Sequence, residues 1–437
     1  MPCAAPPFAR VATCPGPTGL PVASRCPRCA RGTCLAAGTK FRADCPGPGG
    51  LPAAKVCPEC RARANLRDRR ASMSNLLLQP GVTGAQLQRG WTQRVEAIVQ
   101  QMFVDAFAGN EPCRYAFCIA GSGARHEASP FSDLDCFLLL EDDSAANVTF
   151  FRNASKQVSD LLLALDYGSG LRFCNLMSPL GCPGDPTAPE LMRTPHNMAD
   201  VVEWPDARAN AHVKGGLQEN RFLFGTQQLH TDFVTDLNNV VNKTCFTFSS
   251  RVTITRGKQM GLDTIRKLLA DREYAPPQKT DQWFHVKNQF YRPPQFIAKG
   301  LAWFYGVPDV NTVQQLDALV LGNHMSRSVA NNFKPILDVM ARLRFKLHLD
   351  REGEKDFVYV AAATRDAEIA RINGLVTTTK EERDLRTRLQ QGTLLTAQER
   401  ADLVAVIPNL HYIMRLAAEF LREKEKVLGK RNNPFLA

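Results

Sequence analysis

Residues 118–143 read CIAGSGARHEASPFSDLDCFLLLEDD, a stretch in which a Gly-Ser turn precedes two closely spaced carboxylates. The apolar segment before the turn predicts a buried strand, and the segment that begins at Asp133 predicts a second one. The turn residues are Gly121 and Ser122, and a short helix is expected between them and the second strand. Because alternate residues of a strand project from the same face, Asp133 and Asp135 are expected to point in the same direction.

A Gly-Ser turn beside a carboxylate pair is suited to a nucleoside triphosphate. Glycine lets the backbone approach a phosphate closely, and serine adds a hydroxyl group. Two aligned carboxylates can share hard cations such as Mg²⁺ or Mn²⁺, which prefer oxygen ligands. Cations held in this way would activate an attacking hydroxyl and neutralise a leaving pyrophosphate. The residues therefore predict nucleotidyl transfer from an NTP, and the alternative is an ordinary strand–turn–strand with surface acids.

Most of the positive charge lies in the amino-terminal part of the sequence. Residues 1–70 carry twelve Lys and Arg against three acids, and so account for +9 of the net charge of +11 over 437 residues. The rest of the chain is nearly neutral, which gives no sign of binding to a phosphate polymer. The basic segment is interpreted as a solvated tail, with RNA binding as the alternative.

The composition is that of an ordinary globular protein, with 44% hydrophobic and 22% charged residues. No apolar run approaches about 18 residues, so neither a membrane-spanning helix nor a membrane partner is expected. The first residues, MPCAAPPFARVATCPGP, lack the apolar core of a secretory signal peptide. A cytoplasmic protein is therefore expected. If it leaves its cell, as an effector would, it uses a route that needs no signal peptide.

Two copies of a Cys-rich module lie within residues 1–70, the first beginning CAAPPFARVATC and the second CLAAGTKFRADC. Each copy holds four cysteines, and those of the second lie 31 positions after those of the first. Four thiols, the last two in a C-P-x-C knuckle, are the number that a closed tetrahedral Zn²⁺ site requires. Zinc is the favoured interpretation, and disulfide bonds or a tail without fixed structure are the alternatives. The eight candidate zinc ligands are Cys3, Cys14, Cys26, Cys29, Cys34, Cys45, Cys57 and Cys60.

Six further cysteines are scattered along the rest of the chain, mostly among apolar neighbours. They are interpreted as reduced core thiols of a cytosolic protein. These residues are Cys113, Cys118, Cys136, Cys174, Cys182 and Cys245.

Helical periodicity marks residues 85–108, where apolar side chains recur along one stripe. Residues 151–165 are also amphipathic, and GLRFCNLM predicts a further strand before the irregular loop GCPGDPTAP. From about Arg256 onward long helical patterns dominate, including residues 327–347 and 410–428. The predicted fold is therefore α+β, with a mixed sheet and its helices followed by a helical domain. The expected segments are a Cys-rich module at 1–70, a helical lead-in at 71–110, a mixed-sheet domain at 111–255 and a helical domain at 256–437.

The motif G-S, ten residues, then D-x-D resembles the signature of the DNA polymerase β-like nucleotidyltransferase superfamily. The wider string is similar to one branch, which contains the uridylyltransferases of the nitrogen-regulatory signal protein and the CBS-associated nucleotidyltransferases. LQENRFLFG resembles a segment of that branch with a carboxylate, an Arg two residues later and then a Gly. FHVKNQFYRPPQFIAKGLAWFYGV and ILDVMARLRFKLH resemble its helical carboxy-terminal domain. The resemblance covers roughly residues 85–349. It implies a polymerase β-like nucleotidyltransferase domain at 111–255.

The resemblance also implies roles for individual residues. Gly121 and Ser122 would contact the triphosphate, and Asp133 and Asp135 would ligate Mg²⁺ or Mn²⁺. Glu219 aligns with the third carboxylate of the superfamily, which helps to activate the acceptor, although relatives more often carry Asp there.

Four further positions match the branch. Arg125 and Glu127 match its Gly-Arg-x-Glu segment, in which Arg125 would touch phosphate and Glu127 would brace the loop. Lys287 and Arg292 match basic positions of the helical domain and would reach the nucleotide, or else they are surface charges. His126 is interpreted as a loop residue, because metal-assisted nucleotidyl transfer needs no histidine base. No His-Asp doublet occurs in the sequence, so a built-in reverse hydrolase activity is not expected.

Three functions remain open at this point. The first is Mg²⁺-dependent transfer of UMP or AMP from an NTP to a hydroxyl of a protein acceptor, with release of pyrophosphate, as kinship with uridylyltransferases implies. The second is nucleotidyl transfer to RNA or tRNA, with the basic Cys-rich module holding the nucleic acid. The third is a non-catalytic binding or scaffold protein whose zinc modules dock a partner.

Overall fold

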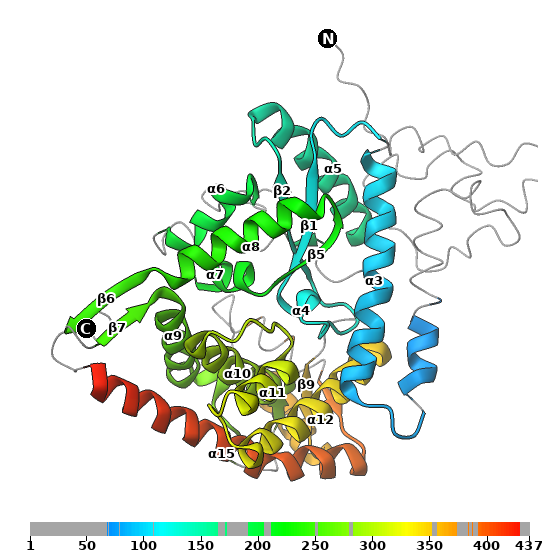
Figure 1. Ribbon diagram of the computed structural model, residues 1–437. Coiled ribbons are helices and arrows are strands. Elements are labelled where there is room, and N and C mark those ends of the chain that lie inside the picture. Colours follow the sequence, from blue (N-terminus) through cyan, green and yellow to red (C-terminus); the bar gives the residue numbers. More distant parts are fainter. Residues whose placement is uncertain are drawn as a thin grey trace, which may run out of the picture. The chain divides into compact units, whose positions relative to one another are not determined.

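The computed structural model resolves the chain into two compact units (Figure 1). The first consists of the described residues up to Gln79 together with Arg89–Val240, and the second consists of Pro80–Gln88 and the described residues from Val241 onward. The division falls within helix α3 (Gly84–Phe107). The structure describes residues 68–107 except 69 and 78, and residues 109–164, 171–172, 191–204, 211–249, 252–278, 283–351, 356–373, 383, 387 and 392–428.

The first unit is built on a five-stranded mixed sheet. Its strands are ordered β3-β2-β1-β5, and β4 also pairs with β2. Strand β1 is antiparallel to β2 and β5, whereas β2 is parallel to β3 and β4. The strands are β1 (Tyr115–Ala120), β2 (Leu134–Leu140), β3 (Leu171–Arg172), β4 (Met192–Arg193) and β5 (Asn220–Gly225). Besides α3, the helices are α4 (Gly121–Ala124), α5 (Ala145–Ala164), α6 (Pro195–Ala199), the 3-10 helix η5 (Asp200–Glu203), α7 (Ala211–Gln218) and α8 (Gln227–Asn242).

Strands β1 and β2 form the buried centre of this sheet. Phe117 pairs with Leu138 and Cys118 with Phe137. Every residue of β1 except Tyr115 is buried, as expected from its unbroken apolar run. Strand β2 is buried throughout except at one position near its start. Both strands predicted around the Gly-Ser motif are confirmed, and so is the α+β fold class.

Helices cover both faces of the sheet (Figure 1). The ring of Phe103 in α3 lies 4.7 Å from that of Phe117, and the ring of Phe233 in α8 lies 5.3 Å from that of Phe137. Because Phe117 pairs with the residue next to Phe137, these two side chains point to opposite faces. The predicted apolar stripe of α3 is therefore the surface that packs on the sheet. Its buried members are Val95, Ile98, Val99, Met102, Phe103 and Phe107.

The second unit is mainly helical, as predicted. It also contains the hairpin β6–β7, which the expected boundary after residue 255 had assigned to the preceding domain. No helix among the described residues is long and apolar enough to span a bilayer. The helices are α9 (Arg256–Ala270), η6 (Arg272–Tyr274), η7 (Val286–Tyr291), α10 (Arg292–Tyr305), α11 (Thr312–Leu321), α12 (Arg327–Arg351), α13 (Ala362–Asn373) and α15 (Ala397–Leu428). The strands are β6 (Thr244–Ser249), β7 (Val252–Thr255), β8 (Trp283–His285), β9 (Phe357–Tyr359) and β10 (Thr393–Leu394).

Several elements differ in extent from the predictions. Helices α5, α12 and α15 are longer than the amphipathic segments that predicted them. Strands β8, β9 and β10 form a small sheet that was not predicted, because two or three residues are too few for a periodic pattern. Only Leu171–Arg172 of GLRFCNLM is described as a strand, and the rest of that segment and the loop GCPGDPTAP lie outside the described residues.

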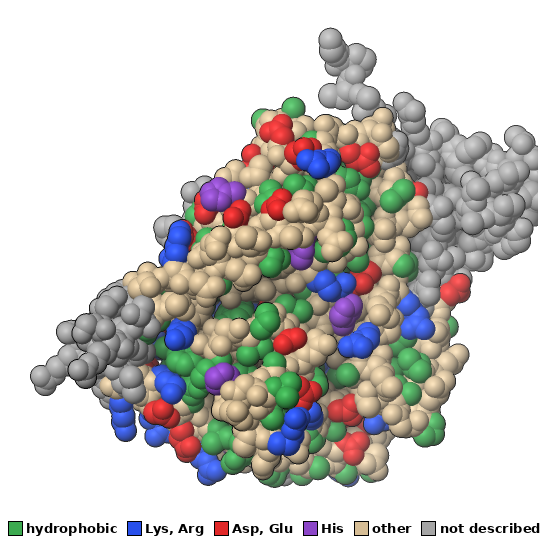
Figure 2. Space-filling model, viewed as in Figure 1, with side chains coloured by type: hydrophobic (Ala, Val, Ile, Leu, Met, Phe, Trp, Pro, Cys, Tyr) green, Lys and Arg blue, Asp and Glu red, His purple; other side chains and the backbone are tan. Residues whose placement is uncertain are grey.

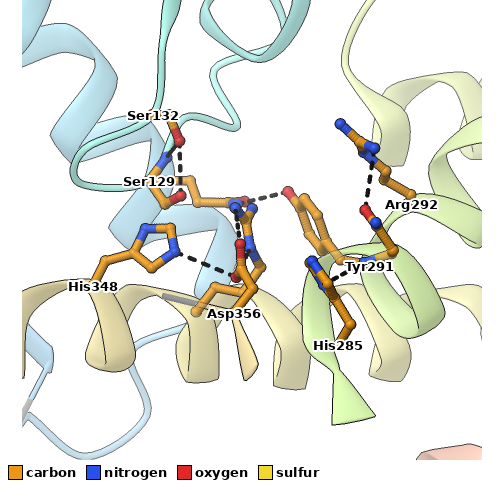
Figure 3. A network of polar contacts seen from close by, with 10 residues as sticks. Ser129, Ser132, His285, Tyr291, Arg292, His348 and Asp356 are labelled. Carbon is orange, nitrogen blue, oxygen red and sulfur yellow. Dashed lines mark hydrogen bonds and ion pairs between the residues drawn. The ribbon is translucent and has the colours of Figure 1, made fainter. Parts of the chain in front are cut away.

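A buried charged cluster ties β9 to α12 in the second unit. Asp356, just before β9, accepts a hydrogen bond from Arg344 Nε at 2.8 Å, and His348 Nε2 lies 3.3 Å from its carboxylate (Figure 3). Burial alone would raise the pKa of Asp356, but Arg344 and His348 outweigh it and hold the pKa well below its usual range. Removing one member would leave an uncompensated buried charge, which typically costs about 3–5 kcal/mol.

Helices α9 and α10 meet through two glycines. A Cβ placed on Gly300 would lie 2.6 Å from Ile265 Cγ1 and 2.9 Å from the carbonyl oxygen of Gly261. A Cβ placed on Gly261 would lie 2.8 Å from the backbone nitrogen of Phe304 and also strike the carbonyl of Gly300. These neighbours are largely backbone atoms, which cannot move aside as a flexible side chain can.

The six-residue π-helix η7 begins at a histidine cap. His285 Nδ1 accepts a hydrogen bond from the backbone N–H of Asn288 at 3.3 Å. Prolines 293 and 294 then set the start of α10, since neither can donate a backbone hydrogen bond to the preceding turn. Burial, together with nearby cations, lowers the pKa of His285 to about 4, although the carboxylate of Asp356 opposes this shift. The cations concerned are Lys287, Arg344 and Arg292.

Gly261→Ala should destabilise the second unit, because the new methyl group meets backbone atoms of α10. We expect a loss of about 1–3 kcal/mol, which exceeds the gain of about 1 kcal/mol in helix propensity. Gly257→Ala on the same helix is the matched control, since its Cβ would meet nothing nearer than 3.5 Å. The shift in urea midpoint measures both, and equal behaviour of the two variants would contradict the close helix contact.

The low pKa of His285 predicts acid sensitivity. The unfolded chain binds a proton at His285 near pH 6.5, whereas the folded chain binds it only near pH 4, so stability falls as the pH falls through this window. His285→Asn keeps an oxygen acceptor for the cap but cannot titrate. Between pH 7 and 4.5 the variant should lose less stability than the wild type, by on the order of 1–3 kcal/mol. Denaturant midpoints at both pH values test this, and parallel losses would refute it.

Candidate functional site

The Gly-Ser turn lies directly against the second carboxylate of the D-x-D pair. Gly121 follows β1, opens α4 and has a positive φ of 56°, a conformation that glycine adopts without strain. A Cβ on Gly121 would lie 2.6 Å from Asp135 Oδ2. Glycine is therefore required here both for its backbone conformation and for the close approach of Asp135.

The two aspartates lie at the beginning of β2. Asp135 precedes Cys136, which pairs with Ile119 of β1, and Asp133 immediately precedes the strand. Both side chains are half-buried, at the end of the sheet where the central strand β2 begins. Among the described residues no group of three or more His, Cys, Asp or Glu side chains is arranged to hold a metal ion. A pair of carboxylates matches Mg²⁺, which usually binds one or two carboxylates and completes its shell with water and phosphate oxygens.

Backbone hydrogen bonds close the loop that follows Gly121. The N–H of Arg125 donates to the carbonyl of Gly121 at 3.1 Å, and that of His126 donates to Gly123 at 3.1 Å. The N–H of Glu127 donates to the carbonyl of Ser122 at 2.8 Å. Ser122 itself is half-buried in the first turn of α4. The turn is thus closed by its own hydrogen bonds, and its position depends on the contacts that it makes with other elements.

Arg125 holds the turn through two buried carboxylates. Its Nε lies 2.8 Å from Glu127 Oε2, and its Nη1 lies 2.6 Å from Glu219 Oε2. Glu219 is only 2% exposed and immediately precedes β5, whose first residue, Asn220, pairs with Ala120 at the end of β1. The structure therefore brings Arg125, Glu127 and Glu219 together beside the Gly-Ser turn.

Arg221 provides a second support, which the sequence analysis did not assign. Its Nε donates to the carbonyl of Ala124 and its Nη2 to that of Gly123, each at 3.3 Å. The same Nη2 forms a short ion pair with Glu96 on α3. Burial raises the pKa of Glu96, and the Arg221 guanidinium partly offsets that effect. Two features of the sequence could have pointed to this ion pair, namely the arginine in LQENRFLFG and Glu96, which lies beside the apolar stripe of α3.

His126 is not positioned as a proton donor at neutral pH. Burial, together with the charges of Arg221 and Arg89, lowers its pKa to about 4. It is also a non-glycine residue with a φ of 56°, so its backbone is held in a conformation that is unfavourable for most side chains. The interpretation of His126 as a loop residue agrees with both observations.

The two basic residues expected to reach the nucleotide belong to the second unit. Lys287 lies in η7, and Arg292 begins α10. Arg292 Nη1 donates a hydrogen bond to Asn288 Oδ1 at 3.1 Å (Figure 3). The same atom lies 3.5 Å from the hydroxyl of Tyr274. Gly121 and Asp135 belong to the first unit, where the structure places the Gly-Ser turn beside the D-x-D pair. Lys287 and Arg292 do not belong to that unit.

The cysteine predictions have mixed outcomes. The eight candidate zinc ligands lie outside the described residues, as do Cys174 and Cys182, so zinc binding stays a prediction. Cys118 and Cys136 are buried free thiols, and burial raises the pKa of Cys118 well above its usual range. Cys113 and Cys245 are only half-buried, so the expectation of core thiols is wrong for these two. Both lie beside strand ends, where one face meets solvent.

The face of the molecule drawn in Figure 2 carries scattered charges of both signs. This agrees with the near-neutral charge of the chain beyond residue 70. Such a surface gives no electrostatic preference for a phosphate polymer.

Comparison with known proteins identifies two family domains. Residues 68–171 match the family described as "Putative nucleotidyltransferase DUF294", and residues 258–364 match the "Putative nucleotidyltransferase substrate binding domain" of the same family. No curated protein is similar enough to this chain to match it. The first match contains the Gly-Ser turn and both aspartates, and the second contains η7 and α10. The chain therefore carries a DUF294 nucleotidyltransferase domain and its substrate-binding carboxy-terminal domain, consistent with a branch of the polymerase β-like nucleotidyltransferases.

Proposed function

We propose that the protein transfers a nucleoside monophosphate, UMP or AMP, from an NTP to a hydroxyl group of a protein acceptor and releases pyrophosphate. The family match supports nucleotidyl transfer as the general activity. The observation that carries the proposal is the contact of the Gly121 backbone with the Asp135 carboxylate. A triphosphate bound at the turn would have its phosphates beside the two aspartates.

Asp133 and Asp135 are the proposed ligands for Mg²⁺ or Mn²⁺. Their oxygen donors suit a hard cation. Their side chains are half-buried at the start of β2, which leaves them within reach of water and substrate. A divalent cation bound there would neutralise the negative charge of the triphosphate and of the leaving pyrophosphate. The role of the aspartates would be to hold this cation beside the phosphates, since a carboxylate by itself repels a phosphate.

Gly121 and Ser122 are the proposed contacts for the phosphates. Without a side chain at Gly121, the backbone can approach both a phosphate oxygen and Asp135. The Ser122 hydroxyl can donate a further hydrogen bond to a phosphate oxygen. In the reaction, the oxygen of the acceptor hydroxyl forms a bond to the α-phosphorus, the bond to pyrophosphate breaks, and the hydroxyl proton is released to water.

Two considerations support a protein acceptor. The sequence resembles the uridylyltransferases of a signal protein, and the chain beyond residue 70 is nearly neutral. RNA binding would ordinarily require a concentrated positive charge, and the chain beyond residue 70 carries only 11 − 9 = +2 of the net charge of +11. An RNA acceptor and a non-catalytic scaffold role are the outcomes against which the protein acceptor is tested.

An incorporation assay tests the proposal directly. The purified full-length protein is mixed with Mg²⁺, a cell lysate and each α-labelled NTP in turn. We expect one NTP to label a band that protease removes and ribonuclease does not. The double variant Asp133→Ala/Asp135→Ala should lower incorporation at least about a thousandfold, because several kcal/mol of metal-dependent stabilisation are lost.

The other outcomes of this assay are equally informative. A labelled band removed by ribonuclease would identify RNA as the acceptor and overturn the protein-acceptor proposal. Absence of label with all four NTPs, from a folded wild-type protein, would favour a scaffold. Circular dichroism of the double variant checks that its loss of labelling does not arise from unfolding.

Gly121→Ala should damage the site more than its backbone strain alone explains. The methyl group would displace the Asp135 carboxylate, and we expect incorporation to fall by roughly a hundredfold. Gly109→Ala is the matched control, because Gly109 also has a positive φ but no atom within 4 Å of its Cβ position. Both variants should lose about 1–2 kcal/mol of stability. Equal activity of the two would contradict the importance of the Gly121–Asp135 contact.

A further inference from the structure

The start of β5 directs two charged side chains at the same short helix. Glu219 and Arg221, two positions apart, reach the loop after Gly121 and the carbonyl end of α4 respectively. Arg221 is further linked to Glu96 on α3. The turn is therefore attached to two elements, β5 and α3, by ion pairs whose carboxylates are almost fully buried.

Glu219 is poorly suited to removing a proton from an acceptor. Its carboxylate is 2% exposed and accepts a charge-assisted hydrogen bond of 2.6 Å from Arg125. Protonating Glu219 would remove the negative charge that pairs with the Arg125 guanidinium. Losing one partner of a buried pair is costly, so the geometry favours keeping the Glu219–Arg125 ion pair intact.

Arg221 binds the carbonyl end of the short helix α4. Its guanidinium donates to the carbonyl of Ala124 and to that of Gly123, which also accepts a hydrogen bond from the His126 N–H. Its fork of N–H donors allows it to contact both carbonyls and the Glu96 carboxylate at the same time. A lysine could supply the charge but not this set of contacts.

We propose that Glu219 and Arg221 are positioning residues, which hold the Gly121–Ala124 turn through the clamps Glu127–Arg125–Glu219 and Glu96–Arg221, and that Glu219 does not activate the acceptor. The inference rests on the proposed function for its catalytic consequence. The clamps keep Gly121 against Asp135, where a displacement of about 1 Å can cost about a hundredfold in rate.

A double-mutant cycle distinguishes positioning from catalysis. Glu219→Gln, Arg125→Gln and the double variant are compared by kcat and KM for the NTP. If Glu219 acts through Arg125, each single variant should raise KM and lower kcat/KM by about 10–100-fold, and the double variant should be no worse than the poorer single one. Effects that multiply, or a loss in kcat alone from Glu219→Gln, would show an independent catalytic carboxylate and overturn the inference.

Hydrogen exchange provides a readout that does not depend on activity. The amides of residues 125–127 donate within the turn, so Glu219→Gln and Arg221→Lys should increase their exchange at least about tenfold, whereas amides of β1 should not change. Arg221→Lys retains the positive charge and remains informative if Glu219→Gln does not fold. Glu141→Gln, which breaks an exposed pair with Arg114, is the matched control and should leave this exchange unchanged.

The two failures can be told apart. If the wild-type protein incorporates no nucleotide, the proposed function fails, but increased exchange at residues 125–127 in the clamp variants still establishes the clamps. If exchange at residues 125–127 is unchanged in Glu219→Gln and Arg221→Lys, the clamps fail, even if the wild-type protein is active.

Discussion

The first unit depends on the absence of a side chain at one position. Gly121 leaves β1 with a positive φ and brings its backbone so close to Asp135 that a methyl group would collide with the carboxylate. This contact fixes the end of one strand against the beginning of its neighbour. This contact agrees with the antiparallel register of β1 and β2, which places the end of β1 beside the aspartates at the start of β2. A side chain at position 121 would move the turn away from the Asp135 carboxylate even if the sheet remained intact.

The surroundings of the turn are held by charge as well as by apolar packing. Glu96, Glu127 and Glu219 are all buried, and each contacts a guanidinium of Arg125 or Arg221. Buried ion pairs add little net stability compared with apolar residues of similar volume, but they have strict geometric requirements. In this site that strictness is useful, because the position of a four-residue helix cannot be fixed by its own hydrogen bonds. These ion pairs thus add little to the stability of the fold but fix the position of α4 accurately.

The sequence was sufficient for the parts of the structure that local patterns determine. The unbroken apolar runs predicted β1 and β2, and the stripe from Val95 to Phe107 predicted α3. The small sheet of β8, β9 and β10 could not be predicted, because its strands are very short and come together from distant segments. The role of Arg221 was also missed, since its partners are two backbone carbonyls and a glutamate 125 positions earlier in the chain. Such long-range polar pairings leave no periodic signal in the sequence.

The contact between Gly261 and Gly300 has a mechanical consequence for the second unit. With backbone lying directly on backbone, α9 and α10 cannot shear past one another without forcing a carbonyl into an amide or a side chain. The two helices must therefore move together as one rigid body in any rearrangement of this unit. Arg292, at the start of α10, would travel with them, and the hinges of such a motion would have to lie in the segments that flank the pair.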